Sequence, residues 1–273
     1  MTAVTEADIA EWRQHVGRTE IRRQLLDTAS LRRFAAATGA ERDVMTAPPP
    51  LALWAWFAGA VSDGELGPDG HPKRGGFIPP ITLPRRMFAA ASFRFEAPLL
   101  LDREAELEVR IADLDHKRGR SGDLVFVVVD RTVRQEGEVR IAERQTLVYR
   151  GAGAPVPLPV PADDAESGDV WRPEAVHLFR FSAVTFNSHR IHYDLPYATV
   201  VEDYPGLVVQ GPFAAAKLAM LAARDGPLAT FAFRAEAPLF AGQPVRLERT
   251  GPGGLCALRC DGAIAVSATA SWR

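Results

Sequence analysis

The heptapeptide FRFEAPL at residues 93–99 returns as FRAEAPL at residues 233–239, with six of the seven positions identical. Apolar residues alternate after the first copy at Leu107, Val109 and Ile111, a pattern typical of a strand. An internal match of this kind, with similar elements around each copy, indicates a duplicated structural unit. The repeat therefore predicts two related halves.

Each copy continues as strand, strand, tight turn and strand. The turn dipeptides are Glu136-Gly137 in the first half and Asp261-Gly262 in the second, and such dipeptides favour hairpins. We expect antiparallel strands in both halves.

The segments before the copies also correspond. Residues 50–64 and 212–226 both begin with proline, end with glycine and are apolar on nearly every side. Such a segment predicts a buried helix. The expected fold class is therefore α+β, with each half a long apolar helix wrapped by a curved antiparallel sheet. We expect halves at residues 1–150 and 170–273, joined by a proline-rich linker at 151–169.

Composition narrows the class of protein. Of the 273 residues, 47% are apolar and 24% charged, with a net charge of −2, so we expect a globular protein without the basic face of a nucleic-acid binder. No apolar run approaches the roughly 20 residues of a membrane span, and the first residues lack the apolar core of a signal peptide. Cys256 and Cys260 are interpreted as buried free thiols, in keeping with a cytoplasmic location.

The stretch TFNSHRIHYD at residues 185–194 carries the candidate chemistry. In a metal site, His189 and His192 would need Asp194 or Glu202 as a third ligand, and the spacing differs from HExxH; we therefore expect no metal. In a structural reading, the polar residues cap the exit from a strand at 177–183.

A catalytic reading has support from the segment that follows. Histidine can accept and return a proton near neutral pH, whereas the amide of Asn187 can only orient water. Gly211 precedes Pro212 at the start of the second apolar helix, where a free backbone N–H group can stabilise an oxyanion. This combination suits chemistry beside a carbonyl group.

These residues resemble the MaoC-like double hot-dog hydratases and dehydratases. The signature of that family runs approximately S/T-G-D-x-N-P-x-H-x-D. The resemblance aligns His192 with the catalytic histidine, Asp194 with the trailing acid, Asn187 with the catalytic aspartate and His189 with the asparagine. The standard aspartate–histidine pair is thus altered here.

One subgroup of this family resembles the sequence more closely than the general signature does. It includes mesaconyl-C4-CoA and itaconyl-CoA hydratases and the mitochondrial type-2 3-hydroxyacyl-thioester dehydratases, in which TFNxHRIHYD and EGYPGLVVHGPL are typical. Here residues 202–213 read EDYPGLVVQGPF, and LPRRMFAAASF and KRGRSGDLVFV in the first half are also similar. The resemblance covers most of the chain.

The resemblance implies a hydro-lyase that adds or removes water across the α,β double bond of an enoyl-CoA, for example a short branched dicarboxylyl-CoA. His192 would be the acid/base, Asn187 would orient water, and the Gly211 N–H would form the oxyanion hole. The alternatives are a hot-dog thioesterase and a non-catalytic acyl-thioester-binding module. No cofactor is expected beyond coenzyme A as part of the substrate.

Substrate contacts are expected from basic and polar residues near the site. Arg86, Lys117 and Arg118 are candidates for the phosphates of coenzyme A, and Arg190 for a second carboxylate. His189 would orient the loop or contact substrate, while Asp194 and Glu202 favour structural roles. The acyl group, the choice between coenzyme A and acyl carrier protein, the direction of reaction, and a monomer or homodimer stay open.

Overall fold

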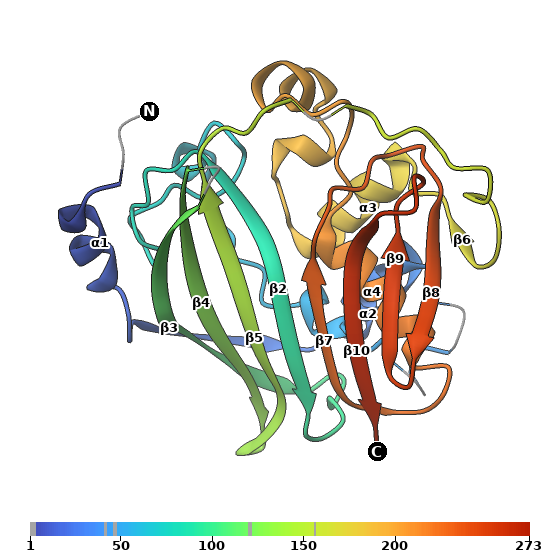
Figure 1. The fold of residues 1–273 in the computed structure, drawn as a ribbon. Helices are drawn as coiled ribbons and strands as arrows, with labels where there is room; N and C mark the ends of the chain where they lie inside the picture. Colours follow the sequence, from blue (N-terminus) through green and yellow to red (C-terminus); the bar gives the residue numbers. More distant parts are fainter. Residues whose placement is uncertain (1–3, 41–42, 46–47, 120–121, 156) are drawn as a thin grey trace.

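The computed structural model describes residues 4–40, 43–45, 48–119, 122–155 and 157–273. Within these residues, ten strands form one antiparallel sheet in the order β1-β3-β4-β5-β2-β7-β10-β9-β8-β6 (Figure 1). The strands are β1 (Thr19–Leu25), β2 (Arg85–Phe95), β3 (Glu104–Gly119), β4 (Gly122–Gln135), β5 (Glu138–Arg150), β6 (Val170–Trp171), β7 (Leu228–Ala235), β8 (Val245–Gly251), β9 (Gly254–Leu258) and β10 (Ile264–Trp272).

The pairing of β2 with β7 joins the two halves. Phe93 of the first heptapeptide corresponds to Phe233 of the second, so position 92 corresponds to position 232. Ser92 and Ala232 are direct partners across this junction. An approximate two-fold axis therefore passes through this pair, and the duplication predicted from the sequence is confirmed.

The two heptapeptides also end in the same way. Two successive N–H groups, those of Glu96 and Ala97, share the carbonyl oxygen of Arg140, and those of Glu236 and Ala237 share that of Ala265. The backbone therefore leaves the sheet in the same way at the repeated EAP sequence of each half.

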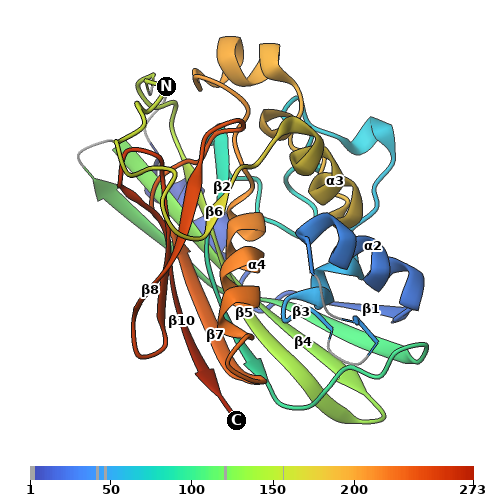
Figure 2. The same ribbon diagram turned by 90° about the vertical axis from the view of Figure 1, so that its right-hand side faces the viewer.

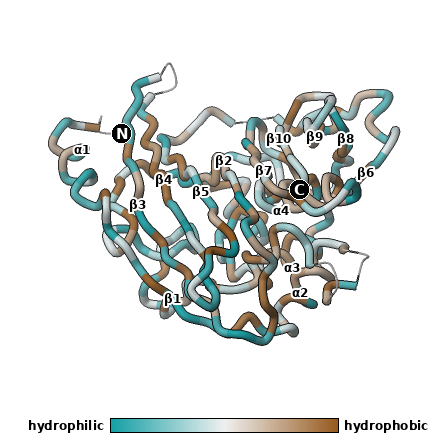
Figure 3. The backbone as a smooth tube through the Cα atoms, turned by 90° about the horizontal axis from the view of Figure 1, so that it is seen from below, coloured by the Kyte–Doolittle hydropathy of each residue, from teal (hydrophilic) through white to brown (hydrophobic). Residues whose placement is uncertain are grey.

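Three helices lie against one side of the curved sheet (Figures 2 and 3). α4 is apolar on nearly all sides and packs on β7 and β10. Phe213 of α4 stacks on Phe181 of α3, with ring centroids 4.6 Å apart. The helices, including α1 outside this group, are α1 (Glu6–Arg13), α2 (Thr28–Thr38), α3 (Ala175–Thr185) and α4 (Gly211–Ala222).

The helix predicted for residues 50–64 is wrong, although the α+β class is confirmed. No α-helix forms there; the segment has a 3₁₀ turn, Ala52–Ala55, and the start of a second one, Asp63–Glu65. The indole N–H of Trp54 donates to Glu143, and the N–H of Phe57 donates to the side chain of Gln24. These side-chain partners hold the segment in an irregular path, and an apolar run alone cannot distinguish such a segment from a helix.

The strand predicted for residues 177–183 is also wrong, because α3 occupies it. Leu178, Phe181 and Ser182 are buried, and this three-to-four spacing is that of a helix. The turns at Glu136-Gly137 and Asp261-Gly262 join β4 to β5 and β9 to β10 as predicted.

Other expectations concern the linker, the cysteines and membrane spans. The described part of residues 151–169 forms no helix or strand, and Cys256 and Cys260 are buried free thiols, as predicted. None of the helices in the described residues has the length and apolar character that crossing a bilayer requires.

Replacement of Phe231 tests the packing of the buried aromatic side chains where β2 pairs with β7. This side chain is fully buried and its ring lies 6.4 Å from those of Phe93 and Phe233. Phe231→Ala should lower the free energy of unfolding by about 3–5 kcal/mol because it leaves a cavity. Phe179→Ala, at a side chain 62% exposed, should cost less than about 1 kcal/mol. Equal denaturation midpoints for the two variants would contradict this packing.

Candidate active site

His192 is held in a defined tautomer. α3 ends at Thr185, and the chain reaches the 3₁₀ turn Arg190–His192 through a short loop. The ring Nδ1 of His192 lies 2.7 Å from the carbonyl oxygen of Val208. Since a carbonyl oxygen only accepts, Nδ1 carries the proton and Nε2 presents a lone pair.

Burial keeps the histidines of this region neutral. His192 is 7% exposed, and burial lowers its pKa to about 4. Burial lowers the pKa of His189 to about 2, and the neighbouring His71 and His192 add to the effect. At neutral pH the Nε2 atom of His192 is therefore free to accept a proton.

The first half supplies two residues that the sequence analysis missed. The carboxylate of Asp69 lies 3.2 Å from Nδ1 of His71. The ring of His71 packs on that of His189, with centroids 4.2 Å apart, and His189 in turn contacts His192 edge to face at 5.3 Å. Three imidazoles thus form a row that ends at His192. The one available signal was the aspartate and histidine within PDGHP at residues 68–72. This stretch lies in the loop at residues 62–84, before β2, which is called the inserted loop below.

Backbone contacts fix this inserted loop on the histidine loop. The N–H of Arg190 donates to the carbonyl of Asp69, and the hydroxyl of Ser188 donates to the carbonyl of Gly70. Gly70 has a φ of +87° and lies against the backbone of Ser188. Only glycine allows so close an approach.

Asp69, His71 and His189 could be considered as metal ligands, since their ligand atoms lie within 4.8 Å of one another. Two imidazoles on one tetrahedral zinc would have centroids about 5 Å apart, whereas these rings pack against each other at 4.2 Å. Asp69 is already bonded to His71. The arrangement therefore fits a carboxylate–imidazole pair better than a metal site.

Asn187 lies beside a surface cavity. Its side-chain oxygen accepts from the N–H of His189 at 3.1 Å, which leaves the amide NH₂ group available. The cavity measures about 250 Å³ and is also lined by Phe179, Phe186 and Tyr193. His192 is not among its lining residues; His189 connects the two, through its N–H to Asn187 and its ring to His192.

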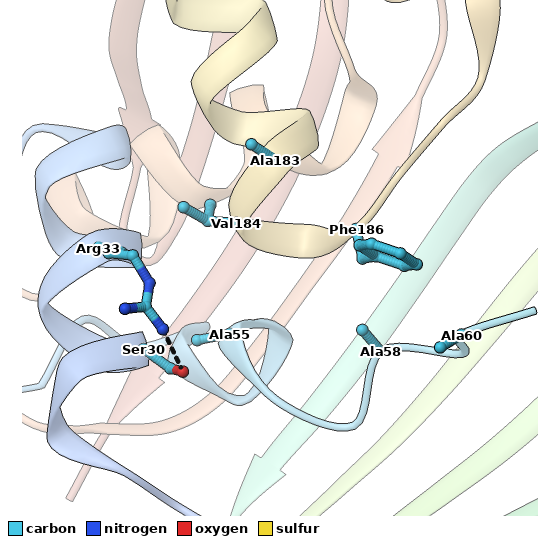
Figure 4. A pocket seen from close by; sticks show the side chains of 8 residues that line it. All are labelled: Ser30, Arg33, Ala55, Ala58, Ala60, Ala183, Val184 and Phe186. Atoms are coloured by element: carbon cyan, nitrogen blue, oxygen red, sulfur yellow. Dashed lines mark hydrogen bonds between the residues drawn. The ribbon is translucent and has the colours of Figure 1, made fainter.

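A second cavity, of about 260 Å³, shares Ala183 and Phe186 with the first (Figure 4). Arg33 and Ser30 of α2, joined by a hydrogen bond, form one wall. Ala58 and Ala60, from the segment where the predicted helix is absent, form another. The missing helix thus leaves open space beside the histidine loop.

Gly211 offers a free N–H group at the start of α4. Pro212 has no N–H, and the N–H of Phe213 donates to the carbonyl of Gln210. Among the described residues, no acceptor is bonded to the N–H of Gly211, which lies at the positive end of the helix. Val208, whose carbonyl holds His192, is only three residues earlier, so one segment fixes both groups.

Gln210 is a third residue that the sequence analysis missed. It is 1% exposed, and its Nε2 atom donates to the carbonyl of Leu178 and the hydroxyl of Ser182. These bonds attach the start of α4 to α3.

The remaining polar residues of the motif are engaged in ion pairs. The Arg190 guanidinium donates to Asp194 at 2.7 Å and to the carbonyl of Pro68 at 3.0 Å. Glu202 lies 3.2 Å from Arg85, and burial raises the pKa of its carboxyl group. These contacts occupy the carboxylates of Asp194 and Glu202 and the guanidinium of Arg190, and structural roles for the two acids stay a prediction.

The basic residues proposed for substrate binding divide between two faces of the sheet. Arg86 is in register with Tyr149, whereas Lys117 is in register with Leu124, the neighbour of Arg150. Successive residues of a strand face opposite sides, so Arg86 and Lys117 do not meet. Arg118, 67% exposed, pairs with Asp123 at the tip of the β3–β4 hairpin.

The fold and this site define a double hot-dog protein. A MaoC-like dehydratase from Phytophthora capsici superimposes with a TM-score of 0.65 at 14% identity, covering 97% of this chain and 99% of that one. A protein of Mycobacterium tuberculosis described as having a double hotdog fold superimposes with a TM-score of 0.52 at 12% identity, covering 93% and 95%.

Sequence comparison gives the family. Residues 52–241 match hydroxyacyl-thioester dehydratase type 2. The chain is also 45% identical to a mesaconyl-C(4)-CoA hydratase of Chloroflexus aurantiacus, covering 95% of this chain and 97% of that one. The chain therefore belongs to the hydroxyacyl-thioester dehydratase type 2 family and is a hydro-lyase. The resemblance noted in the sequence is confirmed.

The buried histidines should make stability depend on pH. Burial lowers the pKa of His71, His189 and His192 below the ordinary value, so below about pH 6.5 the unfolded chain binds protons that the folded protein does not. The contribution of these histidines to the free energy of unfolding should be fully present above about pH 7 and should fall as the pH drops toward 4. His189 and His192, with pKa values of about 2 and about 4, each contribute a slope of up to about 1.4 kcal/mol per pH unit in that interval.

Denaturant unfolding across this pH range measures the slope. His192→Gln removes one titrating group, so the slope of the free energy of unfolding against pH should fall by about 1.4 kcal/mol per pH unit. This holds whatever the effect of the variant on stability at pH 7. Identical slopes for the wild type and the variant would contradict the lowered pKa of His192.

Replacement of Gly70 tests the docking of the inserted loop. A Cβ atom there would meet the carbonyl oxygen of Ser188 at the impossible distance of 1.9 Å, and the positive φ adds about 1–2 kcal/mol of strain. Gly70→Ala should displace Asp69 and His71 and lower both stability and activity. In Gly76→Ala the new atom meets nothing within 4 Å, so wild-type behaviour is expected. Equal activities and midpoints would exclude this docking.

Proposed function

We propose that this enzyme hydrates the double bond of a short, branched dicarboxylyl-CoA, with mesaconyl-C4-CoA as the first candidate. The observation that carries this proposal is the neutral His192, fixed by the carbonyl of Val208 three residues before the free N–H of Gly211. The 45% identity to a mesaconyl-C(4)-CoA hydratase over nearly the whole chain supports the choice of substrate.

In this mechanism the thioester carbonyl accepts a hydrogen bond from the N–H of Gly211. Negative charge that develops on its oxygen is stabilised there, and such a donor contributes about 3–4 kcal/mol to lowering a barrier. His192 Nε2 takes a proton from water as its oxygen bonds to the β carbon. The same proton then passes to the α carbon, so no other reactant is needed.

Asn187 holds the attacking water in this mechanism, because its amide NH₂ group is not used by the protein. His189 connects Asn187 with His192 and keeps the loop in place. The phosphates of coenzyme A have candidate partners in Lys117 and Arg118.

The alternative hypothesis, a thioesterase activity, has less support. A hot-dog thioesterase would need a carboxylate on the central helix to activate water, and α4 contains no acid between Gly211 and Ala222. A binding module without activity would not need a buried imidazole with a free lone pair, because an unpaired polar atom costs stability.

Assays with mesaconyl-C4-CoA test the proposal. Loss of the ultraviolet absorbance of the conjugated thioester reports hydration, and a thiol reagent reports hydrolysis. The wild type should remove the absorbance without releasing thiol. His192→Ala should lower kcat by about 10²–10⁴-fold, the usual contribution of a general base.

The matched control is His177→Ala, which removes a histidine at the start of α3 and should leave kcat near the wild-type value. Asn187→Asp should keep partial activity. Release of thiol, or full activity in a folded His192→Ala protein, would refute the mechanism.

A further inference from the structure

The hydroxyl group of Tyr149 is buried without a hydrogen-bond partner. Tyr149 is 0% exposed, and none of the described residues bonds to its oxygen. A buried hydroxyl that bonds to nothing destabilises the fold, and native structures contain few such groups. The unpaired hydroxyl therefore points to a ligand.

Arg86 is the cross-strand partner of Tyr149, and its guanidinium makes no described hydrogen bond or ion pair. Arg86 and Tyr149 are direct partners in the pairing of β2 with β5, so both side chains face the same side of the sheet. The structure describes no hydrogen bond or ion pair of the half-buried Arg86 side chain to the described residues. Its neighbour Arg85, on the opposite face, is paired with Glu202.

The other charged groups around Arg86 and Tyr149, a region called the corner below, leave it with a net positive charge. The guanidinium of Arg74 lies over the Tyr149 ring at 5.1 Å and donates to backbone carbonyls. The acid of this corner, Asp69, is bonded to His71. Two arginines thus face one carboxylate that already has a partner, and an anionic ligand would balance the charge.

This corner adjoins the catalytic histidine. Burial, and after it the positive charge of Arg86, lowers the pKa of His71. The ring of His71 begins the row that continues through His189 to His192 at centroid distances of 4.2 and 5.3 Å. The charge of Arg86 also acts on His189, the middle ring of the row and the neighbour of His192.

We propose that Arg86 and the Tyr149 hydroxyl bind the free carboxylate of the acyl group, and that this pair selects dicarboxylyl thioesters. The inference rests on the proposed hydratase function. In mesaconyl-C4-CoA the free carboxylate is attached to the β carbon that water attacks, so its receptor must lie beside the base. Arg190, expected from the sequence to bind this carboxylate, is paired with Asp194 instead.

The test compares two thioesters that differ at one group. In 3-methylcrotonyl-CoA a methyl group replaces the free carboxylate of mesaconyl-C4-CoA. Arg86→Met should lower kcat/KM for mesaconyl-C4-CoA by about 100-fold or more and change that for 3-methylcrotonyl-CoA less than about threefold. Arg94→Met, at an exposed arginine of the same strand, should keep the wild-type preference.

Tyr149→Phe separates binding from stability. Because the hydroxyl has no partner in the protein, its removal should leave the denaturation midpoint equal or higher. It should nevertheless lower kcat/KM for the dicarboxylyl substrate by about 5–20-fold. A loss of stability with unchanged selectivity would overturn this assignment.

Binding of unreactive analogues distinguishes failure of the inference from failure of the proposed function. Calorimetry with methylsuccinyl-C4-CoA and isovaleryl-CoA, which also differ by carboxylate against methyl, needs no catalysis. The wild type should prefer the carboxylate-bearing analogue, and Arg86→Met should abolish that preference. An inactive wild type with this preference would refute only the hydratase reaction, whereas no preference, or equal losses for both thioesters in Arg86→Met, would refute the carboxylate site.

Discussion

The antiparallel pairing of β2 with β7 is the constraint on which the site depends. It makes one continuous sheet from two half-sheets and sets their relation by an approximate two-fold axis through Ser92 and Ala232. Because β2 begins directly after the inserted loop, this pairing brings the loop of the first half onto the histidine loop of the second. The contacts of Asp69 and Gly70 with residues 188–190 follow from this arrangement.

Duplication frees the two halves to diverge. The second half keeps a long apolar helix, α4, and its start supplies the free N–H of Gly211. In the first half the corresponding segment has no α-helix, only the 3₁₀ turns Ala52–Ala55 and Asp63–Glu65, and a cavity of about 260 Å³ lies beside it. Under the proposed function, one half provides the catalytic groups while the other provides space and charged side chains for the substrate, since the joined sheet stabilises both.

Sequence patterns predicted the repeat, the turns, α4 and the histidine loop, because these depend on short-range signals such as strand alternation, turn dipeptides and helix-start prolines. They could not predict the path of residues 50–64, where Trp54 and Phe57 bond to side chains distant in sequence. Nor could they place Asp69 and His71, which precede His189 by more than a hundred residues. Such contacts arise only when the sheet is assembled.

The alternation of side chains along β2 explains why two adjacent arginines have different surroundings. Arg85 and Arg86 begin β2 side by side, but the pleat turns them to opposite faces. Arg85 meets Glu202 and Asp203 and so joins the halves. Arg86 shares its face of the sheet with Tyr149, and its charge adds to burial in lowering the pKa of His71 and His189. Of these two adjacent arginines, Arg86 is thus the one left without an ion-pair partner, as the carboxylate site proposed here requires.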